Sequence, residues 1–466
     1  MIATGCFKGQ GHAIFGVALF YSLYWALISD MTTTTTAPRR GNALFIIGML
    51  FFIFGFVTWL NGTLIPFLKL ACELHTDLQA FFVTFAFYIA YFFLAIPSAM
   101  ILQKTGYKNG MALGLFVMAL GSLVFIPAAS TRNFALFLVG LFVQGMGLSL
   151  LQTASNPYIT ILGPLNSAAK RISIMGICNK VAGVLSPIII GSIVLKNASS
   201  LETQVHTSTD PVQREAILNA LAGRVIVPYL VMAGVLVILS IAIKMSSLPE
   251  IKEEAAAGSG GDAIAGSVEK SSVFQYPHLL LGVLCIFLYV GVEVLAGDGI
   301  GTFGKAMGLP LDQTKYFTAF TLVAMLVGYV VGIIAIPRWL SQSTALRICA
   351  ILGLVFGVGI LFSTGYVAIL FIALLGLANS LMWPAIWPLA LEGLGKFTKI
   401  ASALLVMGIA GGALLPLLYG GLKDDVHLPN KVAYCVCILP CYVYILYYAV
   451  SGHTAGGRAR LKAKWA

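Results

Sequence analysis

The fold of this chain is decided by two neighbouring apolar runs, LLQTASNPYITILG (150–163) and ICNKVAGVLSPIIIG (177–191). Each run carries polar residues near its middle: Gln152 and Asn156 in the first, Asn179 and Lys180 in the second. A polar group buried in lipid without a partner costs roughly several kcal/mol. We therefore expect these side chains either to pair helices together or to hold a solute that passes through the membrane.

The composition excludes a soluble protein. Of the 466 residues, 59% are hydrophobic and only 10% are charged, whereas a soluble domain is roughly 45–50% apolar and about 25% charged. A net charge of +11 could suit nucleic acid, but in a membrane protein it reflects basic cytoplasmic loops, so we expect no nucleic-acid partner. The eight cysteines lie mostly in apolar runs, show no metal-ligand spacing, and are interpreted as small apolar residues without a disulfide framework.

Apolar segments long enough to cross a bilayer, about 20 residues each, recur in two groups of six. The first group covers 43–67, 79–102, 110–128, 134–161, 172–195 and 225–245. The second group covers 278–300, 316–336, 346–364, 367–391, 400–420 and 432–450. The pattern predicts an all-α membrane protein with twelve transmembrane helices.

The same pattern predicts the domain organisation. Two six-helix halves, 43–245 and 277–450, flank a charged, Gly/Ala-rich linker at 246–276 that cannot form a core. Residues 1–42 form an N-terminal extension, and translation could begin at Met31, which opens an ordinary-looking cytoplasmic N-terminus. Residues 451–466 form a basic tail. In the long loop before the sixth segment, VQREAILNALAG (212–223) is typical of an amphipathic helix outside the membrane.

Basic residues gather in alternate loops. One set of loops, which includes Arg39-Arg40, Lys170-Arg171 and the C-terminal tail, is richer in Lys and Arg than the opposite set. The richer side is cytoplasmic by the positive-inside rule. We therefore expect both termini in the cytoplasm, as an even number of spans requires.

The two halves also resemble each other in sequence. An offset of 229 residues relates six identical pairs, of which Ser173/Ser402 and Pro187/Pro416 are the least attributable to apolar composition; the others are Gly147/Gly376, Lys170/Lys399, Gly183/Gly412 and Gly191/Gly420. A pseudo-symmetric pair of six-helix halves is the arrangement of major-facilitator transporters, with the substrate site between the halves near the midplane.

Candidate site residues begin in the first, second and fourth segments. Asn61 forms a polar notch beside Gly62, which could face a cavity or make an interhelical hydrogen bond. Tyr88 lies one helical turn from Tyr91, so this pair could pack or could stack on a sugar ring. Gln152 and Asn156 share one helix face, and neutral amides that donate and accept suit a hydroxyl-rich ligand.

Charged residues in the fifth and seventh segments point to ion coupling. Lys180 lies ten residues beyond the Lys170-Arg171 turn, roughly 15 Å deep at about 1.5 Å per residue, close to the bilayer centre. A lysine at that depth needs a partner or a neutral form. Glu293 is the deep carboxylate that we expect to bridge to Lys180 across the halves. Asp298 is either a second coupling carboxylate or a solvated helix end.

The tenth segment, LANSLMWPAIWPLALEG, supplies an aromatic platform. Asn379, Trp383 and Trp387 are spaced four apart and share a face, and Pro384 and Pro388 interrupt the helix, as in many cavity-lining transporter helices. Tryptophans can also anchor a helix at the lipid interface. We expect this face to stack on a sugar ring.

The sequence argues against a pump and an enzyme. The histidines show no metal spacing, and no nucleotide motif or paired nucleophile and base is present.

At these residues the chain resembles the fucose/glucose–galactose permease family of the major facilitator superfamily. The segments that carry the resemblance are LNGTLIPFLK (60–69), QAFFVTFAFYIAYFFLAIPSA (79–99), LQTASNPYITILGP (151–164), 179–183, LYVGVEV (288–294) and TKIASALLVMGIAGGALLP (398–416). The resemblance implies cation-coupled uptake of a hexose across the bacterial inner membrane. It also matches Asn179 to a sugar-binding asparagine of the fucose branch. That branch has an acidic residue where Gly62 stands and a glutamate where Gln152 stands.

These departures favour the glucose/galactose or N-acetylglucosamine side of the family. We expect a monomeric hexose symporter without a cofactor or metal, driven by H⁺ or Na⁺. An amino-sugar permease, an uncoupled facilitator and a membrane sensor remain the alternatives. The expected substrate-binding residues are Asn61, Tyr88, Gln152, Asn156, Asn179, Glu293, Asn379, Trp383 and Trp387, and the expected ion-coupling residues are Lys180, Glu293 and Asp298.

Overall fold

The structure, a computed structural model, describes residues 37–161, 168–246, 248, 272–336 and 339–456. The expected start at Met31, most of the linker and the end of the tail lie outside the described residues. The chain divides into two compact units, residues 1–48 and 49–466. The described part of the first unit is the beginning of helix α2 (Ala37–Thr58), and the second unit contains all the features discussed below.

The twelve expected membrane segments are present. Eleven helical stretches within the described residues are long and apolar enough to cross a membrane. One of them, α4 (Asp77–Thr131), has 55 residues and contains a sharp kink at Gly106, where φ is 76° and ψ is 170°. Glycine tolerates this positive φ because it has no Cβ. The two arms of α4 are therefore the second and third expected spans, and the predicted all-α fold is confirmed.

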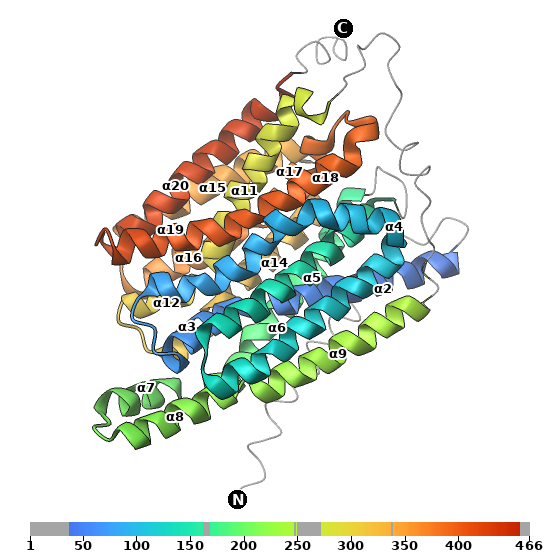
Figure 1. The fold of residues 1–466 in the computed structure, drawn as a ribbon. Helices are drawn as coiled ribbons and strands as arrows, with labels where there is room; N and C mark the ends of the chain where they lie inside the picture. Colours follow the sequence, from blue (N-terminus) through green and yellow to red (C-terminus); the bar gives the residue numbers. More distant parts are fainter. Residues whose placement is uncertain (1–36, 162–167, 247, 249–271, 337–338, 457–466) are drawn as a thin grey trace, which may run out of the picture. The chain divides into compact units, whose positions relative to one another are not determined.

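The remaining helices follow the predicted order (Figure 1). The first half continues with α3 (Asn61–Ala71), α5 (Phe134–Ile161), α6 (Ala168–Val194), α7 (Ala198–Thr207), α8 (Pro211–Gly223) and α9 (Ile226–Met245). The second half contains η2 (Val273–Gln275), α11 (Pro277–Gly297), α12 (Ile300–Ala306), α13 (Leu311–Thr314), α14 (Phe317–Ala335), α15 (Gln342–Phe362), α16 (Gly365–Asn379), α17 (Met382–Leu391), η3 (Gly395–Phe397), α18 (Thr398–Met407), η4 (Gly408–Ala410), α19 (Gly411–Asp424), α20 (Asn430–Val450) and η5 (Gly452–Thr454). The helix expected at 212–223 is α8.

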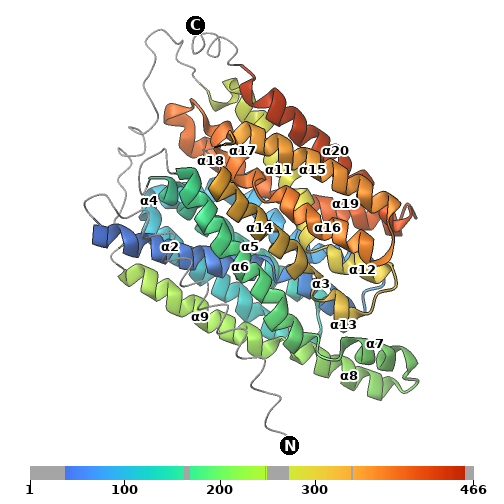
Figure 2. The ribbon, with the colours of Figure 1, turned by 180° about the vertical axis from the view of Figure 1, so that it is seen from behind.

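Helices pack both within each half and across the two halves. In the first half α4 lies against α5 and α9, and in the second half α15 lies against α16 and α20 (Figures 1 and 2). The halves meet where α6 packs on α14 and α4 packs on α18 and α19. Large apolar side chains such as Ile238 and Val443 are exposed on the outer faces, where lipid would cover them.

Glycines bring backbones of the same half into direct contact. A Cβ on Gly145 of α5 would collide with the carbonyl oxygen of Phe87 on α4, and a Cβ on Gly376 of α16 would collide with the carbonyl oxygen of Thr321 on α14. Small residues allow this close approach of helices in membranes. Gly376 is also the repeat partner of Gly147, so each half uses small residues in its corresponding fourth helix.

Three membrane segments are interrupted near residues of the expected site. The first span breaks at 59–60, between α2 and α3, and the seventh breaks at 298–299, between α11 and α12. The tenth breaks at 380–381, between α16 and α17. Pro384 accounts for this last break, because proline lacks an N–H and its ring clashes with the carbonyl four residues earlier. The helix thus breaks before the two prolines, and α17 itself runs through Pro388.

Polar contacts join the halves at the end of the molecule that contains α7, α8, α12 and α13, which we name the α8 end. Asp77 at the start of α4 forms ion pairs with Lys69 of α3 and Lys423 of α19. The Leu78 amide donates to Asp424 Oδ2 at 2.7 Å, and Lys305 pairs with Glu202. Asp77 is only 6% exposed, so its two lysines hold a nearly buried charge where the halves meet.

Candidate functional site

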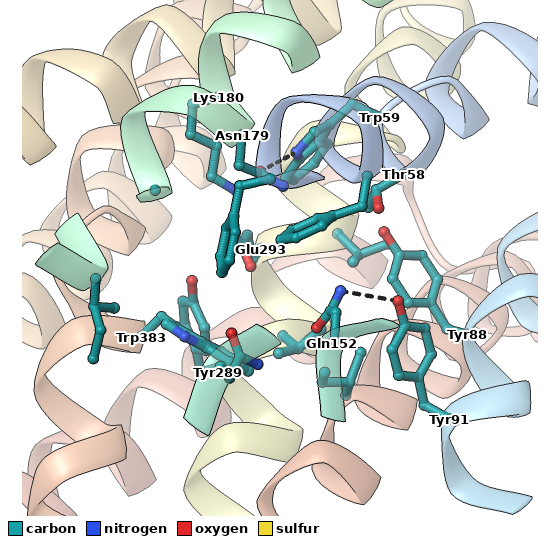
Figure 3. A pocket seen from close by; sticks show the side chains of 18 of the residues that line it. Thr58, Trp59, Tyr88, Tyr91, Gln152, Asn179, Lys180, Tyr289, Glu293 and Trp383 are labelled. Carbon is teal, nitrogen blue, oxygen red and sulfur yellow. Dashed lines mark hydrogen bonds and ion pairs between the residues drawn. The ribbon is translucent and has the colours of Figure 1, made fainter. Parts of the chain in front are cut away.

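A pocket lies between the two halves and brings together most of the expected site residues (Figure 3). The pocket has a cavity volume of about 100 Å³, and the empty space including its opening to solvent is about 740 Å³. Seven of the expected residues line it: Tyr88, Gln152, Asn156, Asn179, Lys180, Glu293 and Trp383. They come from α4, α5 and α6 of the first half and from α11 and α17 of the second.

The pocket contains a buried ion pair between the halves. Lys180 Nζ on α6 donates to Glu293 Oε1 on α11 at 2.7 Å, and the two side chains are only 7% and 10% exposed. The expected bridge is therefore present. In such a site the charges compensate each other's desolvation, so that removal of one partner would leave the other buried and unpaired.

Trp59 organises the Lys180 side of the pocket. Its ring lies under the lysine, with Nζ 4.2 Å from the ring centroid, a cation–π contact. Its Nε1–H donates to Asn179 Oδ1 at 3.2 Å (Figure 3). Trp59 occupies the break between α2 and α3, so the interrupted first span presents the indole to both residues of the Asn179-Lys180 pair.

A second polar contact in the pocket joins Gln152 and Tyr91. Gln152 Nε2 on α5 donates to the Tyr91 hydroxyl at 3.0 Å (Figure 3). The Tyr91 ring stacks on Tyr88, with centroids 6.3 Å apart and an interplanar angle of 24°. Among the described residues, neither the Tyr88 hydroxyl nor the Thr58 hydroxyl has a hydrogen-bond partner, although both residues line the pocket. Both hydroxyls are therefore buried beside the pocket with their hydrogen-bonding capacity unused by the described residues.

Aromatic side chains of the second half complete the wall. Trp383, Tyr289 and Tyr329 line the pocket, and the Trp383 ring stacks on Trp387 with centroids 5.2 Å apart. Trp387 is itself buried and lies behind Trp383, outside the lining. Ile409 also lines the pocket. Because Ile409 is the repeat partner of Lys180, the two halves place a charged and an apolar residue at corresponding positions of one cavity.

The other expected residues lie apart from the lining. Asn379 is fully buried, and its Oδ1 accepts a hydrogen bond from the Tyr442 hydroxyl of α20 at 2.8 Å, so it joins two helices of the second half. The break at 380–381 separates Asn379 from the face that bears Trp383. Asn61 is 1% exposed, and neither polar atom of its side chain has a partner among the described residues, so no interhelical hydrogen bond is seen there.

Asp298 is not a solvated helix end. It is 1% exposed at the break between α11 and α12, and neither carboxylate oxygen makes a hydrogen bond of normal geometry with the described residues. It faces Gly62: a Cβ built on that glycine would lie 3.2 Å from Asp298 Oδ1 and would collide with Thr318 Oγ1. A carboxylate of the second half thus approaches the first half at Gly62.

Several lining residues were not among the expected ones. Trp59 and Thr58 flank the Asn61-Gly62 notch, and Tyr289 lies one helical turn before Glu293, so proximity in sequence could have indicated them. The spacing of three residues from Tyr88 indicates Tyr91. Tyr329 has no such signal, because it reaches the pocket only through the packing of α14 against α6.

A twelve-span all-α fold in two pseudo-symmetric halves, with a polar pocket between them, defines a membrane transporter of the major facilitator type. The sequence profile of the Major Facilitator Superfamily matches residues 47–416. The chain is 34% identical over 424 residues to a glucose/galactose transporter of Brucella abortus (strain 2308), with 90% of this chain and 96% of the relative covered. The chain belongs to the fucose/glucose–galactose permease family of this superfamily.

Two further similar proteins are also transporters. The L-fucose-proton symporter of Escherichia coli (strain K12) is 29% identical over 379 residues, covering 80% of this chain and 85% of the relative. A solved structure of the major-facilitator transporter FucP in the outward conformation has 28% identity and a TM-score of 0.69, covering 87% of this chain and 97% of that one. These relatives are transporters, and the chain is a multi-pass membrane transporter and not an enzyme.

Proposed function

We propose that the chain imports a hexose of the glucose/galactose type together with a cation, by alternating access of its two halves to a pocket between them. The observation that carries the proposal is the content of the pocket: three amides, two hydroxyls without a partner among the described residues and several aromatic rings beside a buried ion pair that links the halves. Names of relatives at 34% and 29% identity, a glucose/galactose transporter and an L-fucose-proton symporter, support this substrate class.

Each group has a role in this proposal. Gln152, Asn156 and Asn179 hydrogen-bond to sugar hydroxyls, because an amide both donates and accepts. Trp383 and Tyr88 offer ring faces to the apolar side of the pyranose. Three expected residues lie outside the lining and hold these side chains in position: Asn61, Asn379 and Trp387. The coupling cation acts through Lys180, Glu293 and Asp298. The name of the fucose relative, an L-fucose-proton symporter, supports a proton as this cation.

The proposal also covers location. The protein would lie in a bacterial inner membrane with both termini and the 246–276 linker in the cytoplasm, so the α8 end would face outward. Residues 43–245 and 277–450 would be the two rocking bodies. In this orientation the ion pairs of Asp77 hold the outer end closed.

Uptake by the purified protein in liposomes tests the function. Radiolabelled glucose should accumulate inside when a proton or a sodium gradient is imposed, each gradient being applied separately. Unlabelled galactose should compete, and fucose should compete more weakly. Competition by N-acetylglucosamine alone would indicate the amino-sugar alternative. Counterflow exchange without accumulation under either gradient would indicate a facilitator, and no exchange of any of these sugars would overturn the proposal.

A further inference from the structure

The carboxyl group of Asp298 is the one acidic group in the membrane-spanning part of the described structure that is buried without a cation beside it. Glu293 has Lys180, and Asp77 has Lys69 and Lys423. Asp298 is 1% exposed and no described residue forms an ion pair with it. An ionised carboxylate in such surroundings is strongly disfavoured relative to the neutral acid.

The helices around Asp298 act on its charge in opposite directions. Asp298 follows the last residue of α11, where the carbonyl groups at the helix end disfavour an anion. On the opposite side stands the backbone amide of Gly62, in the first turn of α3, where N–H groups lack partners within the helix. The Gly62 amide belongs to the first half and Asp298 to the second, so these surroundings exist only while the halves are together at this point.

The other groups that face Asp298 do not neutralise it. The titratable side chains near enough to act on its charge are Lys180 from α6, Glu293 from its own helix and Tyr88 from α4. Lys180 is already bonded to Glu293. Thr318 from α14 and Gly62 from α3 contribute no charge. Tyr88 also lines the pocket, so one of the groups near Asp298 borders the ligand cavity.

We propose that Asp298 binds the coupling proton, and that the halves close over it only when it is the neutral acid. This inference rests on the proposed function and locates its coupling step. While the α8 end is open, a hydronium ion of the outer solution gives its proton to a carboxylate oxygen: an O–H bond of the ion breaks, a carboxyl O–H bond forms and water is left. After closure the carboxyl O–H bond breaks and the proton passes through the pocket to water on the other side, which becomes hydronium. One proton moves per cycle, and no electron is exchanged.

The variant Asp298→Asn tests the step, because asparagine has the size of the acid and is permanently neutral. The matched control is Asp210→Asn, an exposed aspartate at the start of α8 that keeps its capping ability as asparagine. In liposomes Asp298→Asn should retain counterflow exchange of sugar within about twofold, since exchange needs no net proton movement. Sugar-driven proton uptake and accumulation under a pH gradient should fall at least about tenfold. The control should show neither loss.

A second experiment measures the closure of the α8 end in the absence of sugar. Spin labels on Val212→Cys of α8 and Val426→Cys beyond α19, both exposed and in different halves, report the width of the α8 end in a background without native cysteines. With Asp298 present, the distance should be short in acid and longer in alkali. With Asp298→Asn it should not change with pH.

The outcomes separate the two proposals. Wild-type protein that exchanges no hexose overturns the proposed function, whatever the spin-label distances show. Accumulation by Asp298→Asn under a pH gradient, or a wild-type distance that does not change with pH, overturns the role of Asp298 alone. Dependence of accumulation on sodium and not on pH also overturns it. If Asp298→Asn does not fold, Asp298→Glu, which keeps the titrating group, must retain pH-driven accumulation for the inference to stand.

Discussion

Lys180 Nζ lies 2.7 Å from Glu293 Oε1, and this bond joins α6 of the first half to α11 of the second in the centre of the pocket. The ion pair is therefore both a structural link and a charge arrangement that a passing cation or sugar can disturb. A buried pair adds little net stability, but each partner alone is costly.

The first prediction concerns this pair. Lys180→Met and Glu293→Gln should each lower the stability of the folded protein by about 3–5 kcal/mol if the remaining group stays charged. The double variant should be more stable than either single variant, because no charge is left unpaired. Thermal unfolding in detergent, with Lys244→Met and Glu215→Gln as exposed controls, measures this. All three pocket variants should lose gradient-driven uptake, and intact coupled uptake in the double variant would contradict a coupling role.

A second prediction concerns the contact between Gln152 and Tyr91. Tyr91→Phe removes only the hydroxyl that accepts from Gln152, and a net hydrogen bond is worth about 0.5–1.5 kcal/mol. If Gln152 is held in position for the sugar by this bond, the concentration for half-maximal uptake should rise about threefold to tenfold, with the maximal rate little changed. Tyr107→Phe, on the same helix but outside the pocket, is the control. An equal effect in Tyr107→Phe would argue for a general loss of packing.

Trp59 provides the third prediction. Trp59→Phe keeps an aromatic face for Lys180 but removes the N–H that donates to Asn179. We expect weaker sugar binding by about tenfold, because Asn179 loses its fixed orientation. Trp339→Phe, an exposed tryptophan, controls for general effects. Isothermal titration with glucose measures the change, and unaltered affinity would separate Asn179 from the binding site.

The closed α8 end is the subject of the fourth prediction. Asp77→Asn removes the charge that holds Lys69 and Lys423, so the end should open more often. The distance between labels at Val212→Cys and Val426→Cys should then shift toward longer values, and the protein should lose about 1–3 kcal/mol of stability. Asp210→Asn is again the control. An unchanged distance distribution would mean that packing alone closes this end.

The sequence predicts the membrane segments well because each needs a long apolar run, and lipid leaves the backbone little other choice. Periodicity could not predict where spans break. The interruption at 380–381 depends on Pro384 acting on the preceding turn. Asn379, before the break, accepts a hydrogen bond from Tyr442, whereas Trp383, after the break, lines the pocket. Spacing along an unbroken helix does not take this break into account.

Charge was the most informative signal for the site. Lys180 and Glu293 stood out because a charge at membrane depth requires a partner. Tyr329 did not stand out, because an aromatic residue is common in such helices and only helix packing brings it to the pocket. The burial of Asp298 was equally hidden, since it depends on Gly62, distant in sequence, which leaves space for the carboxylate.

The backbone contacts at Gly145 and Gly376 have a mechanical consequence. Each half is stiff where main chain touches main chain, because there is no side chain there that could change its rotamer to absorb a displacement. At the pocket, in contrast, the halves are joined by the long side chains of Lys180 and Glu293, which can extend or retract. Elsewhere the halves meet through main chain, because a Cβ on Gly420 of α19 would collide with the backbone of Leu78 on α4. The contact between the halves is therefore deformable at the pocket and tight at Gly420, so that a force applied at the pocket moves side chains before it moves main chain.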